Sequence, residues 1–171
     1  TITNSINLNK LPNAYLLTGI RGVGKTTTAR LISKALNCNK NFLKEENCNC
    51  NHCEEISNSK HLDVLEMDAA SRTSIDDIRE LIESSKYNPT SAKYKIFIID
   101  EVHMLSKQAF NGLLKTLEEP PPHLKFIFAT TELKKIPVTI VSRCQRFDLH
   151  RVSIKLLLEN LKKISNLEGG K

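Results

Sequence analysis

A glycine-rich loop near the start of the chain limits the folds available to it. Residues 19–26, with the sequence GIRGVGKT, match the pattern G-x-x-x-x-G-K-[ST] at every fixed position. An apolar run, residues 14–18, precedes the loop, and an amphipathic stretch, residues 25–36, follows it. This strand–loop–helix context is the one in which such a loop binds phosphate. A chance glycine turn is the alternative, but it would not require the flanking strand and helix.

The loop has the groups that a nucleotide needs. Its glycines let the backbone turn tightly and aim N–H groups at phosphate oxygens, and the following helix adds its positive N-terminal end. Lys25 is expected to reach the β- and γ-phosphates, and the Thr26 hydroxyl to ligate Mg²⁺. The expected nucleotide-binding residues are Gly19, Ile20, Arg21, Gly22, Val23, Gly24, Lys25, Thr26 and Thr27.

Two carboxylates follow the most apolar strand of the sequence. Residues 94–99 end in four consecutive apolar side chains, and Asp100 and Glu101 come next. Ligands bind at the carboxyl ends of strands in open α/β sheets. Asp100 is predicted to help hold Mg²⁺, and Glu101 to polarise the attacking water as a general base. Such a pair can also form a turn or cap a helix, but the phosphate loop favours an ATPase or GTPase. The absence of an Asn-Lys-x-Asp guanine motif favours ATP.

Apolar runs alternate with amphipathic stretches along most of the chain. Strands are predicted at residues 14–18, 63–67, 94–99, 125–129 and 145–149, and helices at 25–36, 74–84, 106–117 and 153–166. Ser74 and Ser106 are expected helix N-caps. This alternation predicts a doubly wound α/β fold, with a mostly parallel sheet flanked by helices. Residues 37–62 break the rhythm: they are polar, lack periodicity, and are expected to need another restraint in place of a core.

Four of the five cysteines lie in this polar segment: Cys38, Cys48, Cys50 and Cys53, whereas Cys144 stands alone. In a chain with no secretion signal, such a cluster favours a metal over disulfides. Four thiolates bind Zn²⁺ tetrahedrally and leave no position for water, so the site would be structural. Reduced free thiols are the alternative.

Composition and charge exclude several classes of protein. With 171 residues, 40% hydrophobic and 26% charged, the chain suits one globular domain with a sizeable core. No stretch reaches the roughly 18–20 apolar residues of a membrane helix, and residues 1–10 are too polar for a signal peptide. We therefore expect a cytoplasmic protein without a membrane partner. The net charge of +6 lies wholly in residues 125–171, which are expected to face other subunits and DNA jointly, or to form a solvated helix face.

Six sequence motifs, spread over most of residues 12–166, resemble those of a known family. In order they are LTGIRGVGKTTTAR (17–30), DAASRT (68–73), IIDEVHMLS (98–106), LLKTLEEPP (113–121), FATT (128–131) and PVTIVSRC (137–144). The chain resembles the ATPase core of the gamma/tau subunits of the bacterial DNA polymerase III clamp loader, in the AAA+ superfamily. The related delta-prime subunits share LEEPP and SRC but typically have a degenerate phosphate loop. The intact Lys25, Asp100 and Glu101 therefore favour gamma/tau.

The resemblance implies further residue roles. Thr131 matches the polar sensor of the γ-phosphate or its water, although a strand-end hydroxyl alone would more often satisfy the backbone. Arg143 matches the arginine finger, which acts on ATP held by the neighbouring subunit; an isolated arginine would be a surface charge. Cys144 is expected to be a small packed residue and not a nucleophile.

The zinc pattern departs from the family by one residue. The family usually shows C-x8-C-x2-C-x2-C, and Cys38, Cys50 and Cys53 keep their offsets. Asn47 occupies the expected second position, and Cys48 follows it. Either Cys48 reaches the metal by a local backbone adjustment, or His52 substitutes for it.

The resemblance also implies the domain organisation and the function. Residues 1–150 are expected to form the AAA+ nucleotide-binding core, with the zinc-binding insertion at 37–62, and residues 151–171 to begin an incomplete lid. The chain would then be truncated at both ends, as an excised fragment or as a naturally shortened copy. The expected function is ATP hydrolysis that loads the sliding clamp onto primed DNA, in a complex with other clamp loader subunits. The alternative is a non-catalytic paralogue that binds partner subunits or DNA. Candidate DNA contacts are Arg72, Lys134, Lys135, Arg146 and Arg151.

Overall fold

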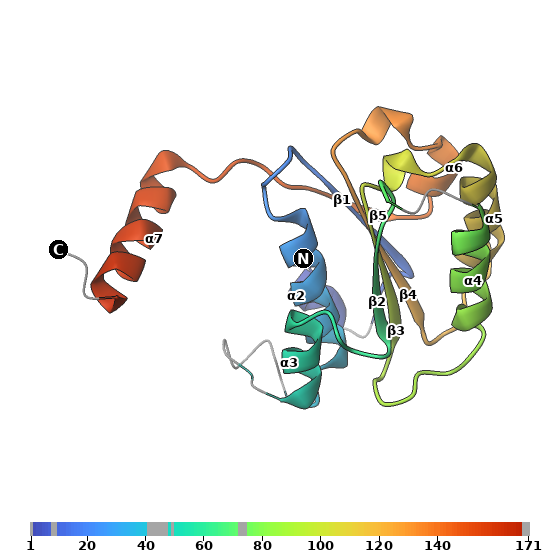
Figure 1. Ribbon diagram of the computed structural model, residues 1–171, viewed down its shortest axis with the longest axis horizontal. Coiled ribbons are helices and arrows are strands. Elements are labelled where there is room, and N and C mark those ends of the chain that lie inside the picture. Colours follow the sequence, from blue (N-terminus) through green and yellow to red (C-terminus); the bar gives the residue numbers. More distant parts are fainter. Residues whose placement is uncertain (1, 8–9, 41–47, 49, 72–74, 169–171) are drawn as a thin grey trace.

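In the part of the chain that the structure describes, five parallel strands form a single sheet in the order β2-β3-β4-β1-β5. The computed structural model describes residues 2–7, 10–40, 48, 50–71 and 75–168. The strands are β1 (Ala14–Thr18), β2 (Val64–Asp68), β3 (Lys95–Asp100), β4 (Leu124–Thr130) and β5 (Gln145–Asp148). All four described strand pairs are parallel, so the predicted α/β class is confirmed (Figure 1). The five predicted strands are present, with ends shifted by no more than one residue.

The burial of each strand explains its place in the sheet. β1 and β4 are buried at every residue, and β3 at all but its last. These three strands are central, because a parallel strand covered on both faces needs apolar side chains on both. β2 and β5 lie at the two edges and expose part of their length. The continuous apolar runs in the sequence therefore mark the centre of the sheet.

Helices cover both faces of the sheet, as the doubly wound prediction requires. The helices α2 (Lys25–Asn37) and α3 (Asn51–Ser57) lie on one face. The helices α4 (Ile75–Ser85), α5 (Lys107–Glu118) and α6 (Val138–Val141) lie on the other (Figure 1). Three further short helices are α1 (Ile2–Asn7), η1 (Val102–Met104) and η2 (Leu133–Lys135).

A separate hydrophobic core forms on each face. On the α4/α5 face, the Phe97 and Phe126 rings lie 5.7 Å apart and the Phe126 and Phe128 rings 5.5 Å apart, under Ile78 and Leu113. On the α2/α3 face, Leu17, Ile98 and Ile127 pack with Ala29 and Ile32. Because alternate side chains of a strand point to opposite faces, one apolar run supplies both cores.

The short helices were not predicted from the sequence: α1, α3, α6, η1 and η2. Of these, α3 lies in the segment that was expected to lack a core. That expectation was wrong in part, because Ile56 of α3 is 2% exposed and packs into the α2-face core. The Ser106 cap is confirmed, since its hydroxyl accepts a hydrogen bond from the Ala109 N–H at 3.2 Å. The Ser74 cap lies outside the described residues.

The final helix α7 (Ile154–Leu167) differs from all the others. Its predicted apolar stripe is present in the sequence, but all of its residues are exposed. Figure 1 shows α7 apart from the sheet, joined to β5 by an extended segment. No described helix has the length and apolar character needed to cross a membrane.

Candidate nucleotide and metal sites

The phosphate loop between β1 and α2 depends on glycine at fixed points. Gly24 caps α2 with φ +94°, in the left-handed region that side chains disfavour. At Gly19, where φ is +152°, an added Cβ would lie 2.6 Å from the Leu149 carbonyl oxygen. The loop is therefore held in shape both by its own backbone and by the chain that follows β5.

Lys25 lies at the first turn of α2 and is buried, with 6% of its surface exposed. Its Nζ donates hydrogen bonds to the carbonyl oxygens of Gly19 and Ile20, both at 3.1 Å. A buried ammonium needs such partners. The charge is thus held against the loop at the point where the phosphates of a nucleotide are expected.

An open cavity of about 370 Å³ lies in front of this loop. It is lined by Arg21, Gly22, Gly24, Lys25, Thr26, Thr27, Asp100 and Glu101. The structure therefore brings the predicted phosphate loop and the predicted acidic pair to one site. The carboxyl ends of β1 and β3 meet at the same edge of the sheet, as expected for parallel strands.

The groups predicted to hold magnesium are in direct contact. The Thr26 hydroxyl donates to Asp100 Oδ2, and Asp100 Oδ1 accepts the Glu101 N–H at 2.8 Å. One hydroxyl and one carboxylate beside a phosphate site fit Mg²⁺, which binds through few protein ligands and keeps several waters.

Glu101 has an uncommon backbone conformation. Its φ of +44° lies in the left-handed region, which non-glycine residues rarely adopt and which often marks functional sites. Its Oε2 accepts hydrogen bonds from the Thr131 hydroxyl at 3.0 Å and the Thr131 N–H at 3.3 Å. The predicted base and the predicted sensor, 30 residues apart, are thus in contact.

His103 belongs to the same network, although no role was predicted for it from the sequence. Only 6% of its side chain is exposed. Its Nδ1 lies 3.0 Å from Thr130 Oγ1 and 3.3 Å from Glu101 Oε2, and its Nε2 lies 3.5 Å from Glu132 Oε1. The sequence signal that could have indicated this role is a histidine two residues after Glu101. The one-turn helix η1 places the imidazole beside the Glu101 carboxylate.

Arg143 lies elsewhere, and among the described residues it does not line the cavity. Its Nη2 is 2.5 Å from Glu118 Oε1, and its Nη1 donates to the Thr139 carbonyl oxygen at 2.6 Å. The next residue, Cys144, is partly buried against the hydrophobic core on the α4/α5 face of the sheet. This burial raises the pKa of its thiol to about 12. Cys144 is therefore a packed residue and a poor nucleophile, as predicted.

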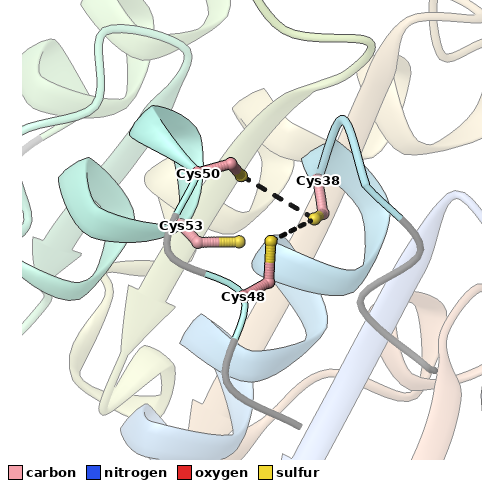
Figure 2. A group of neighbouring side chains, drawn as sticks. All are labelled: Cys38, Cys48, Cys50 and Cys53. Atoms are coloured by element: carbon pink, nitrogen blue, oxygen red, sulfur yellow. Dashed lines mark hydrogen bonds between the residues drawn. The ribbon is translucent and has the colours of Figure 1, made fainter. Parts of the chain in front are cut away.

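The four predicted zinc ligands converge at the other end of α2 (Figure 2). Cys38 follows the last residue of α2, Cys50 precedes α3, and Cys53 lies within α3. The four sulfur atoms all lie within 4.8 Å of one another, with Cys38 Sγ 3.4 Å from Cys48 Sγ and 3.8 Å from Cys50 Sγ.

These separations fit a tetrahedral metal site. Zn–S bonds of about 2.3 Å place the sulfur atoms of a tetrahedron roughly 3.8 Å apart. A disulfide would require about 2.05 Å, and all five cysteines are free. Cys48 and Cys53 are buried at 7% and 2% exposure. The donor set therefore fits Zn²⁺ held in a closed, structural site.

Cys48 and His52 were both open as the fourth ligand, and the geometry favours Cys48. The Nδ1 of His52 lies 2.7 Å from Nε2 of His61, whose Nδ1 accepts the Asp63 N–H at 3.0 Å. The proton of His61 must then be on Nε2, so this nitrogen donates to His52. His52 is engaged in this buried pair, and the sulfur of Cys48 joins the other three.

The crowded thiols have divergent pKa values. Burial alone would raise the pKa of Cys50, but hydrogen bonds from the backbone N–H and side chain of Cys53 lower it to about 6. Burial and its thiol neighbours raise the pKa of Cys53. The first thiolate to form disfavours the next, and a divalent cation at the centre removes that conflict.

Most of the chain matches one known protein family. Residues 1–153 match the family model described as DNA polymerase III, delta subunit. The chain belongs to this family. It is 46% identical to subunit tau of Escherichia coli over 167 residues, covering 98% of this chain and 26% of that protein. It is 48% identical to subunit tau of Bacillus subtilis over 169 residues, covering 98% and 30% respectively.

A third relative agrees with these two. The chain is 50% identical to subunit gamma of Buchnera aphidicola from Schizaphis graminum, covering 98% of this chain and 46% of that protein. The predicted resemblance to gamma/tau is thus confirmed. The chain spans between about a quarter and a half of the length of these curated relatives.

Solved structures show the same fold. A gamma subunit-related protein of Thermotoga maritima superposes with a TM-score of 0.61 at 22% identity, covering 91% of this chain and 47% of that chain. The RuvB Holliday junction branch migration motor of the same organism gives a TM-score of 0.64 at 17% identity, covering 98% and 48%. At these identities the likeness shows the fold alone.

Proposed function

We propose that this chain binds ATP with Mg²⁺ and hydrolyses it as the motor module of a DNA polymerase III clamp loader. Hydrolysis would be coupled to loading of the sliding clamp onto primed DNA in the cytoplasm. The observation that carries the proposal is the single cavity lined by Lys25, Thr26, Asp100 and Glu101. Two motifs that are distant in the sequence supply, at one place, the groups for phosphate binding and for water activation.

Binding follows from the loop and its lysine. The N–H groups of the loop and the N-terminus of α2 attract the phosphate oxygens. Lys25 Nζ exchanges its contacts with the Gly19 and Ile20 carbonyls for a phosphate, so a buried charge gains a stronger partner. Mg²⁺, when bound, neutralises charge on the β- and γ-phosphates. Thr26 and Asp100 are the residues that would hold it.

Hydrolysis needs a base, a polar orienting group and a compensating positive charge. Glu101 accepts the hydrogen bond of the attacking water, and Thr131, already in contact with Glu101, orients water or the γ-phosphate. His103 holds the Glu101 carboxylate in position through its Nδ1 atom. Arg143 lies outside its own cavity, which supports a role on the nucleotide of a neighbouring subunit.

The remaining parts of the chain are proposed to serve the assembly. The names of the relatives support placement in DNA polymerase III with other subunits. We propose that residues 1–150 form the core, that residues 37–62 hold a structural Zn²⁺, and that residues 151–171 begin the lid. Four of the candidate DNA contacts are exposed: Lys134, Lys135, Arg146 and Arg151. Of these, Lys135 pairs with Glu132 and Arg146 with Asp148. Arg72 lies outside the described residues.

The test is ATP turnover by a clamp loader complex reconstituted with this chain, with Glu101→Gln as the variant. We expect roughly 10²–10⁴-fold slower hydrolysis, the range for loss of a general base, with ATP binding retained. Glu159→Gln, on the exposed helix α7, is the matched control and should leave turnover unchanged. Equal turnover in the Glu101→Gln complex would contradict the motor function and leave the non-catalytic binding module as the better account.

A further inference from the structure

The side chain that holds Arg143 comes from a different element of the fold. Glu118 is the last residue of α5, and its Oε1 lies 2.5 Å from Arg143 Nη2. The second anchor of the guanidinium is the Thr139 carbonyl oxygen in α6, 2.6 Å from Nη1. Two helices therefore fix the direction of one long side chain at two points.

This anchoring leaves most of the guanidinium available. The group has five N–H donors, and the two anchors use one on each terminal nitrogen. The remaining donors keep the fork geometry that suits a phosphate. A side chain with many rotamers is thus held in one orientation without losing its capacity to bind a phosphoryl group.

Stability does not account for this pair. The two side chains are 33% and 50% exposed, and ion pairs at that exposure contribute little to folding. The neighbouring Glu119 has the same charge and lies next in the chain, but it lines a separate cavity between the ends of α4 and α5. Glu118 therefore differs from Glu119 in the position of its carboxylate, which contacts Arg143, and not in its charge.

We propose that Glu118 is a positioning residue for Arg143: it holds the guanidinium in the orientation that reaches the nucleotide of a neighbouring subunit. The inference rests on the proposed function, because it assigns a support to the arginine that acts in trans. Glu118 touches neither substrate nor magnesium, so its loss should slow hydrolysis in the adjacent site and leave this chain's own nucleotide affinity unchanged.

The experiment compares four variants of the chain in the reconstituted clamp loader complex, with ATP turnover measured as kcat and KM. Arg143→Ala should lower kcat by roughly 10³-fold, as for an arginine finger. Glu118→Ala should lower kcat about 10-fold with KM unchanged. Glu118→Gln, which keeps an acceptor oxygen, should recover part of that loss. Glu119→Ala, the matched control, should turn over ATP like the unaltered chain.

The possible outcomes distinguish failure of the Glu118 positioning role from failure of the proposed function. Unchanged turnover in Arg143→Ala would overturn the arginine assignment itself. A normal effect of Arg143→Ala, with Glu118→Ala indistinguishable from Glu119→Ala or faster than the unaltered chain, would overturn the positioning role alone. Size-exclusion chromatography checks assembly; if Glu118→Ala fails to assemble, Glu118→Leu, which also lacks an acceptor for the guanidinium, gives the same test, and wild-type kcat in that complex would overturn the role.

Discussion

Helix α2 carries a different site at each of its ends. The phosphate loop leads into its N-terminus, and Cys38 follows its C-terminus, roughly 20 Å away for 13 residues. The first site is made chiefly of backbone, held by the central strands and by glycines with positive φ. The second is made of four side chains, gathered from a polar segment. The backbone site requires glycine where φ is positive, as at Gly24. The side-chain site requires only that four sulfur atoms meet, and Cys48, one residue beyond the position expected from the family, lies close to the other three.

The largest effect is expected at the N-terminal end of α2. Lys25→Ala removes the buried ammonium and should weaken ATP binding by roughly 10²–10³-fold, as for loss of a preorganised electrostatic contact. Lys34→Ala, a lysine of the same helix outside the cavity, is the matched control and should bind normally. Equilibrium titration with ATP measures both. An equal response to the two substitutions would break the distinction between the two ends of α2.

At the C-terminal end the expected effect is on stability. Cys53→Ser removes a buried ligand, so the chain should lose its bound zinc, with a fall in Tm of about 5–10 °C, equivalent to about 2–3 kcal/mol for a domain of this size. Elemental analysis and a thermal melt measure the two effects. Cys144→Ala should keep one zinc per chain. ATP affinity should change less than about threefold in Cys53→Ser; loss of ATP binding together with zinc would show that the two ends of α2 act as one site.

A smaller effect is expected behind the phosphate site. His103→Ala frees the Glu101 carboxylate from one of its partners and should lower kcat in the reconstituted complex by about 10-fold, with unchanged affinity for ATP. His103→Asn keeps a polar atom near the Nδ1 position and should restore part of the rate. A rise in KM with kcat intact would instead mean that His103 supports binding and not the base.

The smallest effect concerns neither site. Gly112 lies within α5, and an added Cβ would meet Ile78 and Ile82 at 3.8 Å, an ordinary contact. Gly112→Ala should therefore stabilise the chain by about 1 kcal/mol and raise Tm by about 2–4 °C. Zinc content and ATP affinity should not change. A lower Tm, measured by the same thermal melt, would contradict the packing described around α5.

The contrast between local patterns and long-range contacts explains which features could be predicted from the sequence. The phosphate loop, the acidic pair and the central strands were predictable, because each is a local pattern with a strict physical requirement. The helix α3 was missed because Ile56 is the one apolar side chain other than Cys53 that it buries. The contacts of His103 with Thr130 and of Glu118 with Arg143 join residues 27 and 25 positions apart. Such contacts depend on how turns and helices pack, which periodicity does not encode.

The apolar stripe of α7 shows a second limit of sequence periodicity. Its spacing predicted the helix correctly, and Ser153 caps it by accepting the Leu156 N–H. Periodicity indicates that a face prefers burial, but it does not say against what. No described element covers this face, and all of its residues are exposed.

Equilibrium titration of the chain with ATP, with and without added Mg²⁺, tests the proposed nucleotide site. We expect saturable binding of one ATP per chain, weakened on the order of 10-fold when Mg²⁺ is omitted, because Thr26 and Asp100 then lose the ion that links them to the phosphates. Absence of saturable binding at millimolar ATP, while circular dichroism shows the α/β fold intact, would contradict the proposed site.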